Sequence, residues 1–244
     1  MYSKEALEKD RIRRHVWKIL TEHGVAKFPL PIEGRIPNFV GAEAAARFLV
    51  NSELFRNAKV VFCNPDSPQR PVREAVLHQG KLLIMASPRL RAGFLVLNPK
   101  EIPRRFYRQA STIRGAFRWG KQVEFPPKID LKVTGSVAVT LDGARLGKGG
   151  GYSDLEYAIL REISAVSEDT PIVTTVHELQ IVEKIPMTKH DVPVDYIFTP
   201  KRVIETNTPY PKPQGIYLED LPREKVENIP LLRKVLSRKG IELK

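Results

Sequence analysis

The sequence predicts an α/β protein whose central sheet is mostly parallel and covered by helices on both sides. Three observations lead to this prediction. Short, continuous apolar runs recur along the first 205 residues, stretches with helical spacing lie between them, and glycine or proline turns separate the two. Strands that are buried on both faces of a parallel sheet are apolar throughout, and helices connect them.

The amino-terminal part is predicted to form a helix followed by an extended connection. Residues 4–22 carry apolar side chains at spacings of three and four, and Gly24 follows as a stop signal. The prolines within residues 28–37 disfavour helix at themselves and just before them. A short helix is expected over residues 42–49.

Strands and helices then alternate. A helix is expected over residues 72–79, where Gly80 ends it, and a longer one over residues 154–166, whose apolar side chains share one face. The apolar runs typical of buried strands cover residues 58–63, 82–86, 93–97, 131–141, 172–176 and 194–198.

The chain beyond Thr206 departs from this pattern, because five prolines interrupt it. We expect this segment to wrap the surface and to end in a short helix near residues 231–238. Single hydrophobic cores stop growing beyond roughly 250–300 residues, so a chain of 244 residues is near the upper end of what one core can hold. The expected organisation is therefore one α/β domain over residues 1–205, with a proline-rich extension over residues 206–244 packed on it.

Composition limits the function classes. Forty Lys and Arg residues against 28 Asp and Glu give a formal charge of +12, which favours nucleotides, polyanionic cofactors or RNA as partners. Cys63 is the only cysteine, so a disulfide within the chain is excluded, and its apolar neighbours predict a buried structural thiol. No apolar run approaches the roughly 20 residues of a membrane span. We expect a cytoplasmic monomer without membrane contact.

The glycine-rich loop Arg145-Leu146-Gly147-Lys148-Gly149-Gly150-Gly151-Tyr152 is the strongest functional signal. It follows the apolar run that ends at Leu141 and leads into the helix from Asp154. Glycines let backbone amides approach phosphate oxygens, and a helix amino terminus favours negative charge. The spacing fits neither the Walker nor the dinucleotide pattern. A plain flexible turn is the alternative.

Two further stretches carry polar groups. Asp191, Asp195 and His190 precede or begin an apolar run. They could hold magnesium or orient a substrate; alternatively, the two carboxylates accept backbone hydrogen bonds. Residues 104–121 combine six cations with aromatic rings, which suits RNA, a flat polyanionic cofactor or an ordinary basic surface with its rings turned inward. The five histidines lack zinc-ligand spacing, and the surroundings of Ser153 do not match a nucleophile elbow.

Three ordered motifs together resemble the 5-formyltetrahydrofolate cyclo-ligase family, also called methenyltetrahydrofolate synthetases. Lys9-Asp10-Arg11-Ile12-Arg13 resembles the family's amino-terminal motif, and residues 143–154 resemble its central glycine motif with Ser153 in place of a tyrosine. Pro186, Asp191 and Asp195 resemble its last motif. Stretches such as residues 36–39 and 135–139 look most like a divergent branch, the methenyltetrahydrofolate synthetase domain-containing proteins.

The resemblance implies a three-layer Rossmann-like fold and an ATP- and Mg²⁺-dependent ligase that converts 5-formyltetrahydrofolate to 5,10-methenyltetrahydrofolate. The implied catalytic residues are Arg145, Lys148 and Asp154. Magnesium would lie at Asp154 and Asp191, and the folate at Asp66 and Tyr152. The implied ATP-binding residues are Lys9, Arg13, Gly147, Gly149, Gly150, Gly151 and Tyr152.

Two segments depart from the family pattern. Residues 64–71, after the first long apolar run, lack the family's Glu-x-x-Thr, and residues 114–119 replace its Ile-Pro-x-Pro stretch. Two alternatives to the folate reaction follow. One is a paralogue whose folate site is altered or lost and which acts on another small-molecule acceptor. The other is a basic RNA-binding protein on the same scaffold.

Overall fold

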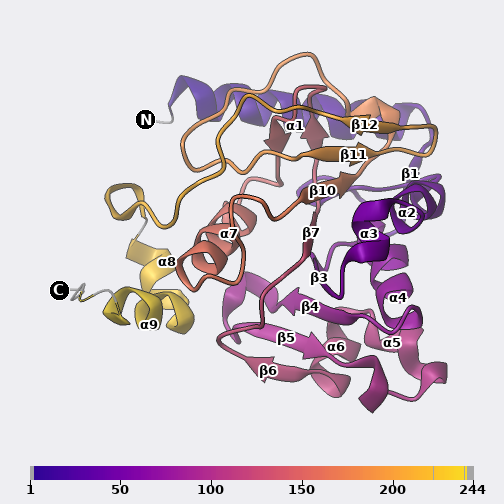
Figure 1. Cartoon of the computed structure of the whole chain (residues 1–244). Coiled ribbons are helices and arrows are strands. Elements are labelled where there is room, and N and C mark those ends of the chain that lie inside the picture. Colours follow the sequence, from indigo (N-terminus) through magenta and orange to yellow (C-terminus); the bar gives the residue numbers. More distant parts are fainter. Residues whose placement is uncertain (1–2, 222, 239, 241–244) are drawn as a thin grey trace.

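A computed structural model, which describes residues 3–221, 223–238 and 240, shows three layers around one large sheet (Figure 1). Five neighbouring strands, from β11 to β4, run parallel, and β12, β5 and β6 add to the edges in the antiparallel sense. The predicted mostly parallel α/β fold is confirmed. In order across the sheet, the strands are β12 (Val203–Glu205), β11 (Tyr196–Phe198), β10 (Ile172–Thr175), β7 (Leu131–Thr134), β3 (Val60–Cys63), β4 (Leu82–Ala86), β5 (Phe94–Leu97) and β6 (Lys121–Val123).

Helices cover the two faces of this sheet (Figure 1). One face carries α2 (Ala42–Val50), α3 (Glu53–Asn57), α4 (Arg70–His78), α5 (Tyr107–Ala110) and α6 (Ile113–Trp119). The other face carries α7 (Tyr152–Glu162), with α8 (Arg223–Asn228) and α9 (Pro230–Arg238) beside it. A third apolar cluster joins α1 (Lys4–Glu22) to a small hairpin made of β8 (Ala138–Val139) and β9 (Arg145–Leu146). A second small hairpin pairs β1 (Ala26–Lys27) with β2 (Asn38–Phe39).

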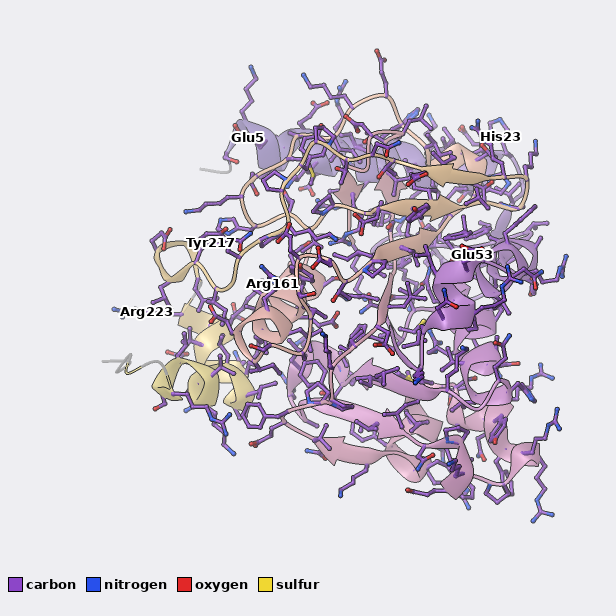
Figure 2. The ribbon with its side chains drawn as sticks, in the orientation of Figure 1. Glu5, His23, Glu53, Arg161, Tyr217 and Arg223 are labelled. Atoms are coloured by element: carbon purple, nitrogen blue, oxygen red, sulfur yellow. The ribbon has the colours of Figure 1, made fainter. Side chains whose placement is uncertain are left out.

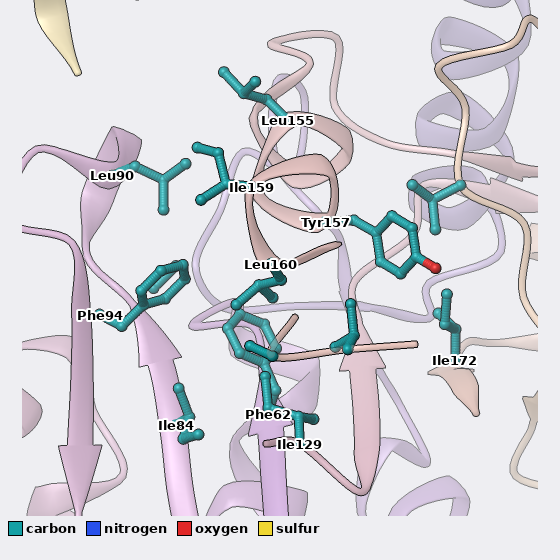
Figure 3. Packing of buried hydrophobic residues seen from close by; sticks show 14 of the residues in the cluster. Phe62, Ile84, Leu90, Phe94, Ile129, Leu155, Tyr157, Ile159, Leu160 and Ile172 are labelled. Atoms are coloured by element: carbon teal, nitrogen blue, oxygen red, sulfur yellow. The ribbon is translucent and has the colours of Figure 1, made fainter. Parts of the chain in front are cut away.

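The core lies on both sides of the sheet, because successive strand residues point to opposite faces. Phe62 and Ile84 belong to the cluster beneath α7, whereas Val61 and Leu83 belong to the cluster beneath α2 and α4. Figure 3 shows Phe62, Ile84 and Phe94 facing the apolar side of α7. This double burial explains why the strands read as continuous apolar runs. Cys63 is buried as predicted, and burial raises the pKa of its thiol to about 11.

Most element boundaries agree with the sequence predictions to within two residues, and two elements differ by more. The helix over residues 4–22 and the strand over residues 82–86 begin and end where predicted. The prediction of one continuous strand over residues 131–141 was wrong. The structure divides this run into β7 and β8, and residues 135–137 turn toward the hairpin. The helix predicted over residues 154–166 is α7, which starts at Tyr152 and ends at Glu162 before the left-handed Ser164, at φ +58°.

The chain beyond Thr206 runs along the outside before it forms α8 and α9. The helix predicted near residues 231–238 is present as α9, and its Leu232 and Leu236 join the same core cluster as Leu155 and Ile159 of α7. The division of the chain at residue 205 stays a prediction. Among the described residues, no helix has the length and apolar character that crossing a membrane requires.

Candidate nucleotide-binding site

The adjacent strands β3 and β7 form the topological switch point of the sheet. The chain leaves β3 toward β4 on one side, and it leaves β7 toward β10 on the other. Ligands of open α/β sheets bind in the crevice at the carboxyl ends of such strands. Asp66 follows β3 here and Gly135 follows β7; a Cβ at Gly135 would lie 2.7 Å from the Asp66 carboxylate. Glycine at this position therefore lets the two strand ends meet.

The glycine-rich loop crosses this crevice between β9 and α7. Gly149 and Gly151 have φ values of +104° and +62°, which favour glycine. Within the described structure, the backbone amides of residues 147–154 donate no hydrogen bond to the protein. Those of Tyr152 to Asp154 form the first turn of α7. Unpaired amides, together with the positive end of a helix dipole, make an anion-binding surface.

Arg145 lies under the loop, and its side chain is 1% exposed. Its guanidinium donates to the carbonyl oxygens of Gly135 (3.1 Å) and Val192 (3.2 Å), and to the carboxylate of Asp154. Arg145 thus joins the end of β7, the segment before β11 and the first turn of α7. The backbone N–H of Val192 also donates to Asp154 (3.2 Å), so that carboxylate is held at the helix start.

A pocket lined by residues of the switch point and the loop contains all three predicted catalytic residues. We call it the switch-point pocket. Lys148, 51% exposed, lies 3.6 Å from Asp66 across it. Among the predicted residues, only Lys9, Arg13, Gly149 and Asp191 do not line it. Its lining residues are Ile36, Asp66, Gly135, Arg145, Gly147, Lys148, Gly150, Gly151, Tyr152, Ser153 and Asp154.

Helix α1 brings Lys9 and Arg13 to the back of the loop. Arg13 donates to the carbonyl oxygen of Gly147 (2.8 Å), and its guanidinium carbon would lie 3.4 Å from a Cβ at Gly149. Lys9 forms an ion pair of 2.5 Å with Asp191, which is 182 residues further along the chain. Arg13 therefore supports the glycine loop, and Lys9 supports the segment that contains Asp191. Direct contact of either side chain with phosphate stays a prediction.

The chemistry of the two predicted magnesium ligands fits a shared metal. Asp154 and Asp191 line one pocket, and in each carboxylate one oxygen accepts all the hydrogen bonds found among the described residues. Mg²⁺ is commonly held by one or two carboxylates together with substrate phosphates and water. In the described part of the chain, no group of three or more His, Cys, Asp or Glu side chains is placed to hold a metal ion.

A second pocket, which was not predicted from the sequence, lies between α7 and the carboxy-terminal segment. We call it the tail pocket. Its volume is about 240 Å³, and it shares Gly151 and Asp154 with the switch-point pocket. Lys225 of α8 lies in its wall and passes 5.1 Å from the centre of the Tyr152 ring. Only the fold could bring residue 225 to the glycine loop.

A buried polar cluster beneath the site was also missed. Lys132 of β7 and Glu156 of α7 form a 2.6 Å ion pair, with side chains 1% and 4% exposed. Asn64, after β3, donates to both carboxylate oxygens of Glu156 at 3.2 and 3.1 Å. The buried guanidinium of Arg73 donates to the carbonyl oxygens of Asn64 and Asp66. A lysine inside an apolar strand was the one available signal.

The basic stretch over residues 104–121 lies elsewhere. Phe106 and Trp119 stack at 4.9 Å, with Arg105 and Arg118 over their outer faces, while Tyr107 is buried. The rings thus pack mainly on one another, although Phe117 remains 47% exposed. No residue of this stretch lines either pocket at the glycine loop. Binding of RNA by this stretch stays a prediction.

Comparison with known proteins gives one consistent result. The model of the 5-formyltetrahydrofolate cyclo-ligase family matches residues 5–200. The methenyltetrahydrofolate synthase domain-containing proteins of Mus musculus and Homo sapiens are 40% and 38% identical over 98% and 95% of this chain. The chain spans 66% and 62% of their lengths.

A solved structure, the 5,10-methenyltetrahydrofolate synthetase of Aquifex aeolicus, has the same fold. It superposes with a TM-score of 0.54 at 22% identity, covering 83% of this chain and 94% of that one. At this identity the likeness concerns the arrangement of the elements alone. It agrees with the three-layer architecture described above.

Proposed function

The chain belongs to the 5-formyltetrahydrofolate cyclo-ligase family, and from this premise we propose that it converts 5-formyltetrahydrofolate to 5,10-methenyltetrahydrofolate with ATP. One observation carries the proposal. The loop over residues 147–154 presents unpaired backbone amides at the switch point of the sheet, with Lys148 beside them. Such a surface suits the phosphates of a nucleotide, which accept many hydrogen bonds and carry negative charge.

In the proposed reaction, the formyl oxygen on N5 attacks the γ-phosphorus of ATP, and ADP leaves. N10 of the folate then attacks the formyl carbon. The ring closes when the phosphorylated oxygen departs as inorganic phosphate, and N10 loses its proton. Catalysis of such a transfer consists largely of positioning and charge neutralisation.

The residues of this chain would divide these tasks. The loop amides and Lys148 hold the phosphates, and Arg145 fixes Asp154 at the first turn of α7. Asp66 lies opposite Lys148, where an acceptor would meet the γ-phosphate. Asp154 and Asp191 would hold Mg²⁺, which when bound supplies positive charge to the phosphate oxygens.

The two segments that depart from the family pattern bear on which molecule accepts the phosphate. Residues 64–71 lack the family's Glu-x-x-Thr, and α6 stands where the family has Ile-Pro-x-Pro. These departures favour a second candidate, a paralogue that phosphorylates another small-molecule acceptor. We propose the folate reaction first, because the three ordered motifs of this chain resemble those of the family.

The near-ultraviolet absorbance of the methenyl product provides the test. Protein, ATP, Mg²⁺ and 5-formyltetrahydrofolate should together produce that absorbance, and omission of ATP should abolish it. No product from a protein that binds ATP would exclude this substrate and favour the paralogue.

Lys148→Ala should weaken ATP binding about 10- to 100-fold, because a charged hydrogen bond contributes roughly 1.5–3 kcal/mol and about 1.4 kcal/mol equals a factor of ten. The melting temperature should change little, since the side chain is half exposed. Calorimetric titration with ATP measures the effect. Lys100→Ala, at an exposed lysine after β5, is the matched control. An equal dissociation constant in wild type and Lys148→Ala would contradict phosphate contact by Lys148.

A further inference from the structure

Lys225 occupies an unusual position on α8. Its ammonium nitrogen lies 2.7 Å from the point where a Cβ at Gly151 would stand, at the residue that caps the amino terminus of α7. Among the described residues, no carboxylate forms an ion pair with it; its one close partner is the ring of Tyr152. A cation is thus placed directly over the glycine loop, next to the unpaired amides.

The surroundings of Lys225 favour an anionic ligand. Burial lowers the pKa of this lysine, while the nearby charge of Asp154 raises it. Lys225 is partly buried, and a partly buried ammonium without an ion pair is stabilised when an anionic group compensates its charge. A phosphate on the amides of Gly151 and Tyr152 would lie beside Lys225 and would provide that compensation.

The tail pocket extends from the same point. Its walls come from Leu155 and Ala158 of α7 on one side, and from Ile216 and Leu221 of the carboxy-terminal segment on the other. Figure 2 shows Tyr217 and Arg223 of this segment beside α7. Nucleotide sites are largely apolar with a few placed polar groups. Because the two pockets share Gly151, a nucleotide with its phosphates on the loop would extend its nucleoside into this one.

We propose that the carboxy-terminal segment completes the nucleotide site, and that its Lys225 binds the phosphates of ATP. The proposal rests on the proposed function. It goes further in one respect, because residue 225 lies outside the stretch matched by the family model. Lys148 and Lys225 would then approach the loop from opposite sides, one from the switch-point pocket and one from the tail pocket.

Titration of the full chain with ATP and with adenosine tests this inference. Lys225→Ala should bind ATP about 10- to 100-fold more weakly, by the value of a charged hydrogen bond, and adenosine should bind as before. Lys225→Arg should recover most of the ATP affinity. The control is Lys234→Ala, which removes another lysine of the same segment whose partner, Glu124, is on the surface. Lys234→Ala should bind ATP like the wild type.

The outcomes separate the two proposals. Suppose that the wild type binds ATP and that Lys148→Ala weakens this binding, whereas Lys225→Ala leaves it unchanged. Phosphate binding by Lys225 is then excluded, and the proposed function stands. If Lys225→Ala weakens the binding of adenosine as much as the binding of ATP, Lys225 shapes the pocket and does not bind phosphate. If the wild type does not bind ATP, both proposals are wrong.

Discussion

Lys132→Met should lower the free energy of unfolding by about 3–5 kcal/mol, because breaking a buried ion pair leaves a charge without compensation. Lys132 and Glu156 are 1% and 4% exposed, and 2.6 Å separates their charged groups. The cation also lies 4.2 Å above the ring of Phe62. Urea unfolding at pH 8 measures the loss.

The same variant should show a specific pH dependence. Burial raises the pKa of Glu156 above its usual 4.5, and Lys132 opposes that rise. Without Lys132 the pKa should rise further. A carboxyl with a raised folded-state pKa stabilises the fold below its unfolded pKa, and this contribution is lost as the pH rises through the folded value. The deficit of Lys132→Met should therefore shrink as the pH falls from 8 toward 4.5.

The double variant Lys132→Met, Glu156→Gln is the control. The double variant buries no unpaired charge. In the wild type Asn64 donates a hydrogen bond to Glu156, and the side-chain oxygen of the glutamine can accept the same hydrogen bond. Most of the lost stability should return. A deficit below about 1 kcal/mol in the single variant, the level of an exposed pair, would show that this ion pair does not hold β7 and α7 together.

Arg145→Met should abolish measurable ATP binding and cost about 3–5 kcal/mol of stability, the range for loss of one partner of a buried ion pair. The guanidinium makes hydrogen bonds to Gly135, Val192 and Asp154. Without it, the end of β7 and the first turn of α7 are no longer joined, and the loop between them loses its support.

Arg11→Met provides the comparison for Arg145→Met. Arg11 pairs with Glu8 on the exposed surface of α1, where it is 74% exposed. Exposed pairs contribute little to stability because water and salt screen them, so this variant should unfold and bind ATP like the wild type. Normal ATP affinity in folded Arg145→Met would mean that the loop does not depend on this arginine.

Local patterns predicted the elements that depend on local forces. The helix over residues 4–22 has its own spacing, an N-cap at Ser3 and a stop at Gly24, so its bounds were correct. The run over residues 131–141 was mispredicted as one strand, because its division into two strands depends on contacts with residues outside the run. Val137 donates to Leu146 across the hairpin, and Gly135 must make room for Asp66.

The site divides in the same way. The loop amides follow from the glycines themselves, and the position of these glycines between an apolar run and a predicted helix indicated an anion site there. The ion pair between Lys9 and Asp191 was not predicted; the family resemblance implied only that Lys9 binds ATP and that Asp191 binds magnesium. Lys225 and the Lys132–Glu156 pair were not anticipated, because chain segments far apart in sequence bring them to the loop. Neither periodicity nor residue spacing predicts contacts of this kind.

The most direct measurement is a calorimetric comparison of ATP and adenosine binding to the unmodified protein with Mg²⁺ present. If the glycine loop holds phosphates, several charged hydrogen bonds separate the two ligands, and ATP should bind at least about 100-fold more tightly. Equal affinities for ATP and adenosine, or no binding of ATP, would contradict the phosphate-binding role of residues 147–154.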